Sequence, residues 1–225
     1  MRLVLFDCDG TLVDSQHVIV ACMNSAFAEH GLDAPAREKV LGIVGLSLNE
    51  AMHSLLDGSD PEAVPVLAQS YRDQFRRYRE TGPAEPLYPQ AFETVTALAG
   101  RDDVLLGIVT GKSQRGVRAV LGHHDLLDHF LTIQTADDAP SKPHPAMVLQ
   151  AIAATGAEAA DTVVVGDTTY DMAMARAAGA GAVGVGWGYH APANLPGAGA
   201  EAVLDTFDDL LPWLDERWTK QEPAA

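Results

Sequence analysis

Residues 3–11 of this 225-residue chain read LVLFDCDGT, an apolar run that passes directly into an acidic turn. Four consecutive apolar residues are typical of a strand that is buried on both faces, as in a parallel sheet. Residues two apart on an extended chain point the same way, so we expect Asp7 and Asp9 to share a side. Gly10 then permits a sharp turn. The stretch therefore predicts a buried strand whose carboxyl end presents two carboxylates.

Further apolar runs indicate that this strand belongs to a parallel sheet. They lie at residues 104–109, 162–165, 182–185 and 202–204. Helical patterns occur between the runs, at residues 90–98, 113–121, 145–154 and 170–178. Strands that alternate with helices in this way predict an α/β fold with a parallel sheet and helices on both faces.

One region interrupts the alternation. Residues 15–86 contain no strand pattern, and we expect them to form successive helices. Ser47-Leu48-Asn49-Glu50 is a capping-box pattern that opens one amphipathic run, and Asp60-Pro61 opens another. The chain is thus expected to have a core made of residues 1–14 and 87–225, with a helical domain, residues 15–86, inserted after the first strand.

Composition and charge exclude several classes of protein. The formal net charge is −16 and there is no basic stripe, so we expect no nucleic-acid partner. Two cysteines are too few for a disulfide framework. The first residues lack the pattern of a signal peptide, and no stretch has the length of a transmembrane helix. We therefore expect a soluble cytoplasmic protein with no membrane partner. An anionic substrate would need a local cation.

The pair Asp7 and Asp9 suggests catalysis, although an ordinary acidic turn is an equal alternative when the pair is considered alone. Two carboxylates this close repel each other unless a cation lies between them or one is protonated. That arrangement suits a nucleophile beside a general acid–base.

Three later motifs favour the catalytic interpretation. Thr110-Gly111-Lys112 follows the second run, Lys142 lies in a proline-flanked segment before a helix, and Asp167 and Asp171 follow the third run one helical turn apart. Considered alone, each motif also has a purely structural explanation: the threonine motif as a turn, Lys142 as a solvated surface charge, and Asp167 as a helix cap. Together they place polar groups at or near several strand ends, where open parallel sheets bind ligands.

This ordered set resembles the haloacid dehalogenase-like superfamily of phosphohydrolases across essentially the whole chain. The resemblance implies a Rossmann-like parallel-sheet core with an inserted all-helical cap, which corresponds here to residues 15–86. It also implies a small phosphorylated metabolite as the substrate and Mg²⁺ as the cofactor.

The resemblance assigns a role to each motif residue. Asp7 attacks phosphorus and becomes an aspartyl phosphate, and Asp9 acts as general acid and then general base. Thr110 and Gly111 bind the phosphoryl oxygens, while Lys142 neutralises Asp7 and the phosphate. The Mg²⁺ ligands are Asp7, the backbone carbonyl of Asp9, and Asp167. Asp171 is not itself a ligand but supports the metal site from outside this set. An all-oxygen set of this kind suits hard Mg²⁺.

Within the superfamily, two segments resemble bacterial phosphoglycolate phosphatases: residues 42–47, and residues 184–190 together with 198–204. The first predicts Gly45 and Ser47 as substrate-binding residues and 2-phosphoglycolate as the substrate. A broad sugar-phosphate or nucleotide phosphatase is the alternative. Asp9 argues against a dehalogenase, and Thr11 argues against a phosphomutase. A non-catalytic binding protein would be expected to lack Asp7 or Asp9. Both a monomer and a homodimer remain open.

Overall fold

The computed structural model describes residues 1–221, and its core is a six-stranded parallel sheet in the order β3-β2-β1-β4-β5-β6. The strands are β1 (Arg2–Phe6), β2 (Val104–Thr110), β3 (Thr132–Thr135), β4 (Thr162–Gly166), β5 (Gly181–Val185) and β6 (Ala202–Leu204). The chain runs outward in one direction from β1 to β3, and in the other direction from β4 to β6. The order of strands therefore reverses between β1 and β4, which is the position where sheets of this kind bind ligands.

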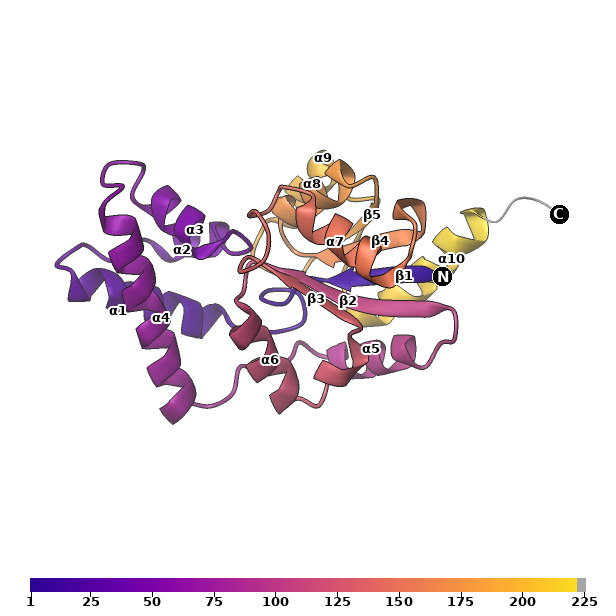
Figure 1. Cartoon of the computed structure of the whole chain (residues 1–225), viewed down its shortest axis with the longest axis horizontal. Helices are drawn as coiled ribbons and strands as arrows, with labels where there is room; N and C mark the ends of the chain where they lie inside the picture. The colour runs from indigo at the N-terminus through magenta and orange to yellow at the C-terminus, as the bar shows by residue number, and fades with distance from the viewer. Residues whose placement is uncertain (222–225) are drawn as a thin grey trace.

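Helices cover both faces of the sheet, as Figure 1 shows. Val4 and Phe6 of β1 pack into one buried cluster, whereas Leu3 and Leu5 pack into another on the opposite face. The first cluster takes residues from α5 (Ala91–Ala99), α6 (Gln114–His123) and α10 (Leu210–Gln221). The second takes residues from α7 (Ala146–Thr155), α8 (Thr169–Ala177) and α9 (Leu195–Ala198). The unbroken apolar run of β1 follows from this burial on both faces.

The inserted helices pack together as a group of their own beyond the carboxyl ends of the strands (Figure 1). They are α1 (Gln16–Glu29), α2 (Arg37–Gly42), α3 (Leu48–Leu55) and α4 (Ala63–Thr81). They share a third buried cluster that includes Met23, Met52 and Leu67. The predicted α/β fold with an inserted helical cap is thus confirmed.

Two local features differ from the sequence-based expectation. Strand β3 was missed, because its sequence Thr-Ile-Gln-Thr has no apolar run and it lies at an edge of the sheet. The capping-box pattern at Ser47 does coincide with a helix start, but the Ser47 side chain makes no cap hydrogen bond.

Short one-turn 3-10 segments complete the connections of the core. They span Leu127–His129, Ala159–Asp161, Pro192–Asn194 and Phe207–Asp209. Within residues 1–221, no helix combines the length and the apolar character needed to cross a membrane.

Candidate active site

Asp7 lies at the reversal point of the sheet, directly after β1. Its backbone N–H donates to the carbonyl of Val165 in β4 at 2.9 Å, and its side chain is buried. The ammonium of Lys142 lies 2.9 Å from Asp7 Oδ1, with both side chains almost completely inaccessible to solvent. The contact is an ion pair, and Asp7 Oδ2 has no hydrogen-bond partner among residues 1–221. The carboxylate therefore keeps free lone pairs in a buried position.

Asp171 fixes Lys142 on the side away from Asp7. Its Oδ1 accepts a hydrogen bond from Lys142 Nζ at 2.5 Å. Its Oδ2 accepts from the backbone N–H of Thr168 at 3.1 Å and from the Thr168 hydroxyl at 2.6 Å, closing a capping box at the start of α8. The helix cap is therefore Thr168 and not Asp167. Both oxygens of Asp171 are therefore engaged by other residues, and the metal-supporting role that the resemblance implies for it stays a prediction.

Asp7, Asp167 and Asp171 form a buried acidic cluster in which one carboxylate oxygen of each lies within 4.8 Å of the others. Asp167 accepts from the Thr11 hydroxyl at 3.0 Å and from the Tyr189 backbone N–H at 2.8 Å. Three converging carboxylates next to an oxygen with no hydrogen-bond partner fit a hard divalent cation. The residues present therefore suit the magnesium that the sequence led us to expect.

Two glycines lie so close to Asp167 that neither position has room for a Cβ atom. A Cβ atom on Gly188 would lie 2.1 Å from the Cβ of Asp167, and one on Gly10 would lie 2.3 Å from Asp167 Oδ2. Gly10 also has a φ of +87°, in the left-handed region that favours glycine. The glycine of the acidic turn is thus required both for its backbone conformation and for the space beside the carboxylate.

Burial dominates the electrostatics of this cluster. It raises the pKa of Asp7 from 3.8 to about 6; Lys142 opposes this shift and Asp171 adds to it. Burial, then Asp171 and Asp7, raise the pKa of Asp167 well above its ordinary value. Burial works against the charge of Lys142, but Asp171 and Asp7 outweigh it and raise its pKa. The site thus holds more negative charge than its one lysine neutralises, which favours a bound cation.

Asp9 faces a different set of partners. Its Oδ1 accepts from Lys112 Nζ at 2.7 Å and from the Ser15 hydroxyl at 2.6 Å. Lys112 also donates to Glu85 Oε1 at 3.1 Å, and Arg79 lies 3.6 Å from the other oxygen of Glu85. This network joins the first strand end, the second strand end and the segment that leads back from the cap.

Thr110 ends β2 beside Asp7, and its buried hydroxyl accepts the backbone N–H of Lys112 at 3.3 Å. Gly111 lies against the cap loop: a Cβ atom there would be 2.5 Å from the Leu46 carbonyl oxygen and 2.6 Å from that of Gly45. A glycine at this position therefore lets the cap loop approach the catalytic strand ends closely.

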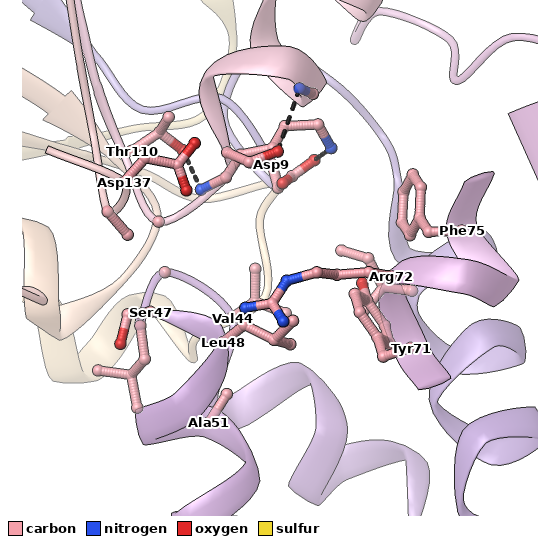
Figure 2. A pocket seen from close by; sticks show the side chains of 18 of the residues that line it. Asp9, Val44, Ser47, Leu48, Ala51, Tyr71, Arg72, Phe75, Thr110 and Asp137 are labelled. Atoms are coloured by element: carbon pink, nitrogen blue, oxygen red, sulfur yellow. Dashed lines mark hydrogen bonds and ion pairs between the residues drawn. The ribbon is translucent and has the colours of Figure 1, made fainter. Parts of the chain in front are cut away.

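A cavity of about 490 Å³ lies between the cap and the strand ends. Figure 2 shows it from close by, with Asp9 and Thr110 on the core side and Ser47, Leu48 and Ala51 on the cap side. The predicted residues that line it are Asp7, Asp9, Thr110, Gly111, Gly45 and Ser47. Lys142, Asp167 and Asp171 do not line it but lie around Asp7. The volume is in the range of small-molecule sites.

Hydrogen bonds hold the cap against the core. The Gly42 carbonyl accepts from the Tyr170 hydroxyl at 3.1 Å and lies 3.2 Å from His190 Nε2. Because His190 Nδ1 accepts the Thr169 backbone N–H, its Nε2 is the donor to Gly42. The Ser47 backbone N–H donates to the Ser141 hydroxyl at 2.8 Å.

The loop at residues 187–190, part of the segment that resembles phosphoglycolate phosphatases, follows β5 but does not line the cavity. The Trp187 indole donates to the Thr11 carbonyl at 3.0 Å, and the Tyr189 hydroxyl accepts the Ser15 backbone N–H at 3.1 Å. The loop therefore supports Asp167 and the junction with the cap rather than contacting a substrate in the cavity.

Sequence reasoning missed several residues of the site. Lys112 belongs to the threonine motif but has no role of its own in that pattern, and Glu85, Arg79, Ser15 and Arg72 lie in no motif. A lysine two residues after a strand-end threonine was the one feature that pointed here. The other four lie in the helical insertion, where the pattern of charges resembles an ordinary solvated surface.

Known proteins confirm the class of the fold. The family described as haloacid dehalogenase-like hydrolase matches residues 4–185, and this chain belongs to that family. The probable phosphatase IndB of Dickeya dadantii is 34% identical over 213 residues, covering 93% of this chain and 91% of the relative. A phosphoglycolate phosphatase of Photorhabdus laumondii is 29% identical, covering 94% of this chain and 91% of its own length. A hydrolase from Pseudomonas syringae, known from its crystal structure, superimposes with a TM-score of 0.84 at 27% identity, covering 96% of this chain and 99% of that one. The chain is therefore a phosphatase of the haloacid dehalogenase-like family.

Proposed function

We propose that this enzyme is a magnesium-dependent phosphomonoester hydrolase that works through an aspartyl phosphate on Asp7. The observation that carries the proposal is the buried Asp7 carboxylate, which lines the cavity with an oxygen that accepts no hydrogen bond and lies beside Lys142. A carboxylate nucleophile needs such a free lone pair aimed at the substrate.

The first step forms a bond between an Asp7 carboxylate oxygen and phosphorus and breaks the bond from phosphorus to the leaving oxygen. Asp9 gives its proton to that oxygen. In the second step Asp9 takes a proton from water, the water oxygen bonds to phosphorus, and Asp7 departs as a carboxylate. Thr110 and Gly111 line the cavity beside Asp7 and bind the phosphoryl oxygens, while Lys142 offsets the charge.

Mg²⁺ would be held by Asp7, the backbone carbonyl of Asp9, and Asp167, while Asp171 holds Lys142 in place. When bound, the ion supplies positive charge that offsets the phosphate and the acidic cluster. Residues 15–86 act as the cap, and the core consists of residues 1–14 and 87–225. The cap excludes bulk water and restricts the cavity to small metabolites.

We further propose 2-phosphoglycolate as the substrate. The resemblance of residues 42–47 to phosphoglycolate phosphatases supports it, with Gly45 and Ser47 on the cavity wall. The alternative remains a broad sugar-phosphate or nucleotide phosphatase. Because the loop at residues 187–190 lies outside the cavity, its resemblance to phosphoglycolate phosphatases does not count against that alternative.

A phosphate-release assay tests both levels of the proposal. The wild-type enzyme is supplied with 2-phosphoglycolate, several sugar phosphates and pyrimidine nucleoside monophosphates, with Mg²⁺ or after exhaustive chelation. We expect turnover that needs Mg²⁺ and a kcat/KM highest for 2-phosphoglycolate. Full activity after chelation would refute the metal assignment. A sugar phosphate or nucleotide preferred by about tenfold, or 1.4 kcal/mol of transition-state binding, would refute the substrate.

A further inference from the structure

Arg72 reaches into the cavity from the cap. It belongs to α4, which also contributes Tyr71 and Phe75 to the cavity wall. Figure 2 shows its guanidinium extending from α4 across the cavity, toward Val44 in the loop after α2 and Leu48 at the start of α3, on the cap side of Asp9. The side chain is therefore placed where the leaving group of a phosphate ester bound at Asp7 would lie.

The guanidinium of Arg72 has no partner among residues 1–221: no hydrogen bond or ion pair joins it to another residue there. Two arginines further along the same helix do have partners. Arg76 pairs with Asp73 at 2.5 Å, and Arg79 lies 3.6 Å from Glu85 and packs over the Phe75 ring. Arg72 is exposed to solvent and lines the cavity, so a ligand in the cavity would meet a cation that no acidic side chain of residues 1–221 neutralises.

The phosphate end of a substrate has its own cations, because Lys142 is paired with Asp7 and the acidic cluster fits a metal. Arg72 is on the other side of the cavity and has mostly apolar neighbours, Val44, Leu48 and Phe75. A guanidinium binds a carboxylate or a phosphate through two parallel hydrogen bonds, and such charge-assisted bonds are stronger than neutral ones.

We propose that Arg72 determines specificity by binding a second anionic group on the leaving-group side of the substrate. The enzyme then selects phosphate compounds whose far end carries a carboxylate or a second phosphate, and it disfavours neutral or cationic leaving groups. This inference rests on the proposed phosphatase function and states which chemical class of phosphate compound that site accepts.

The test compares three small phosphate esters that differ mainly in the charge of the leaving group: 2-phosphoglycolate (anionic), ethyl phosphate (neutral) and phosphoethanolamine (cationic). Pyrophosphate serves as the compound with a second phosphate. The variants are Arg72→Met and Arg72→Glu. Arg77→Met is the matched control, because Arg77 is an exposed arginine of the same helix that does not line the cavity.

We expect Arg72→Met to lower kcat/KM for 2-phosphoglycolate, pyrophosphate or both by about 10- to 100-fold, the range of a charge-assisted hydrogen bond. Turnover of ethyl phosphate should change less than threefold, and Arg77→Met should change neither. Arg72→Glu should shift the preference toward phosphoethanolamine. A loss confined to 2-phosphoglycolate identifies a carboxylate as the recognised group, and one confined to pyrophosphate identifies a phosphate. An equal loss on ethyl phosphate, or no loss on either anion, would overturn the proposal.

A binding measurement distinguishes a failure of this inference from a failure of the proposed function. The affinity of the Asp7→Asn protein for 2-phosphoglycolate, pyrophosphate and ethyl phosphate is measured by calorimetry with Mg²⁺, with and without Arg72→Met. A tenfold weaker affinity for an anionic compound alone supports the role of Arg72 even if the wild type hydrolyses none of them. An effect below threefold on both anions contradicts it, whatever the turnover assay gives.

Discussion

The ammonium of Lys112 lies 2.7 Å from Oδ1 of Asp9, a residue 103 positions earlier in the chain. Lys112 also contacts Glu85, and all three side chains are nearly buried, with exposed fractions of 7%, 11% and 5% for Lys112, Asp9 and Glu85. Burial disfavours the charge of Lys112, but Asp9 and Glu85 more than compensate and raise its pKa. The lysine thus neutralises two carboxylates that would otherwise repel each other beside the catalytic turn.

Lys112→Met should strongly destabilise the protein. Removing one partner of a buried ion pair leaves an uncompensated charge, which costs about 3–5 kcal/mol. Lys39→Met is the control, because Lys39 pairs with Asp57 at 3.6 Å with both side chains well exposed, and its loss should be below about 1 kcal/mol. Urea unfolding of both variants measures the difference.

The Glu85→Gln background identifies the cause of that loss. If Glu85 is one of the charges left unpaired, Lys112→Met should cost at least about 1 kcal/mol less in the Glu85→Gln protein than in the wild type. Equal losses in the two backgrounds would contradict a contribution from Glu85 and leave the charge of Asp9 and the packing of Lys112 as the cause.

Gly188→Ala should impair metal binding. The new methyl group would overlap the Cβ of Asp167, where the separation is only 2.1 Å, so the carboxylate must move. We expect at least a tenfold higher Mg²⁺ concentration for half-maximal activity. Gly197→Ala is the control, since nothing lies within 4 Å of a Cβ at that position. An unchanged Mg²⁺ requirement in Gly188→Ala would mean that Asp167 is not a metal ligand.

The metal-free protein should lose stability as the pH rises, through Asp7. Its pKa is about 6 in the folded chain and 3.8 ordinarily, so between these values the folded state holds more protons. The free energy of unfolding therefore falls as pH rises through this window, by about 3 kcal/mol in all. Asp7→Asn removes this term. In chelator, the stability of Asp7→Asn relative to wild type should increase by about 2 kcal/mol from pH 4.5 to pH 7. A constant or decreasing difference would contradict the burial of a charged Asp7.

Local patterns in the sequence were sufficient to predict most of the fold and of the acidic cluster. The run 3–6 is apolar because both of its faces are covered, and Asp7 and Asp167 follow neighbouring strands whose carboxyl ends meet. Geometry of this kind depends on residues close in sequence and on one general rule about parallel sheets.

Contacts between distant segments could not be predicted. The Ile-Gln pair within Thr132–Thr135 gives β3 little apolar character, because an edge strand needs less burial. The partners of Lys112 and the direction of Arg72 depend on how the cap sits against the core, which no local pattern encodes. The loop at residues 187–190 belongs to a segment that resembles phosphoglycolate phosphatases, yet its glycine and tyrosine contact Asp167 and not the cavity.

The central claim is that Asp7 is the nucleophile. Asp7→Asn keeps the shape of the side chain but replaces the charged oxygen that attacks phosphorus. The most direct measurement is kcat of the Asp7→Asn enzyme with saturating Mg²⁺ and the best substrate of the wild type. We predict a loss of at least about 10⁴-fold, equivalent to about 5.5 kcal/mol. Activity within tenfold of the wild type would contradict an aspartyl phosphate on Asp7.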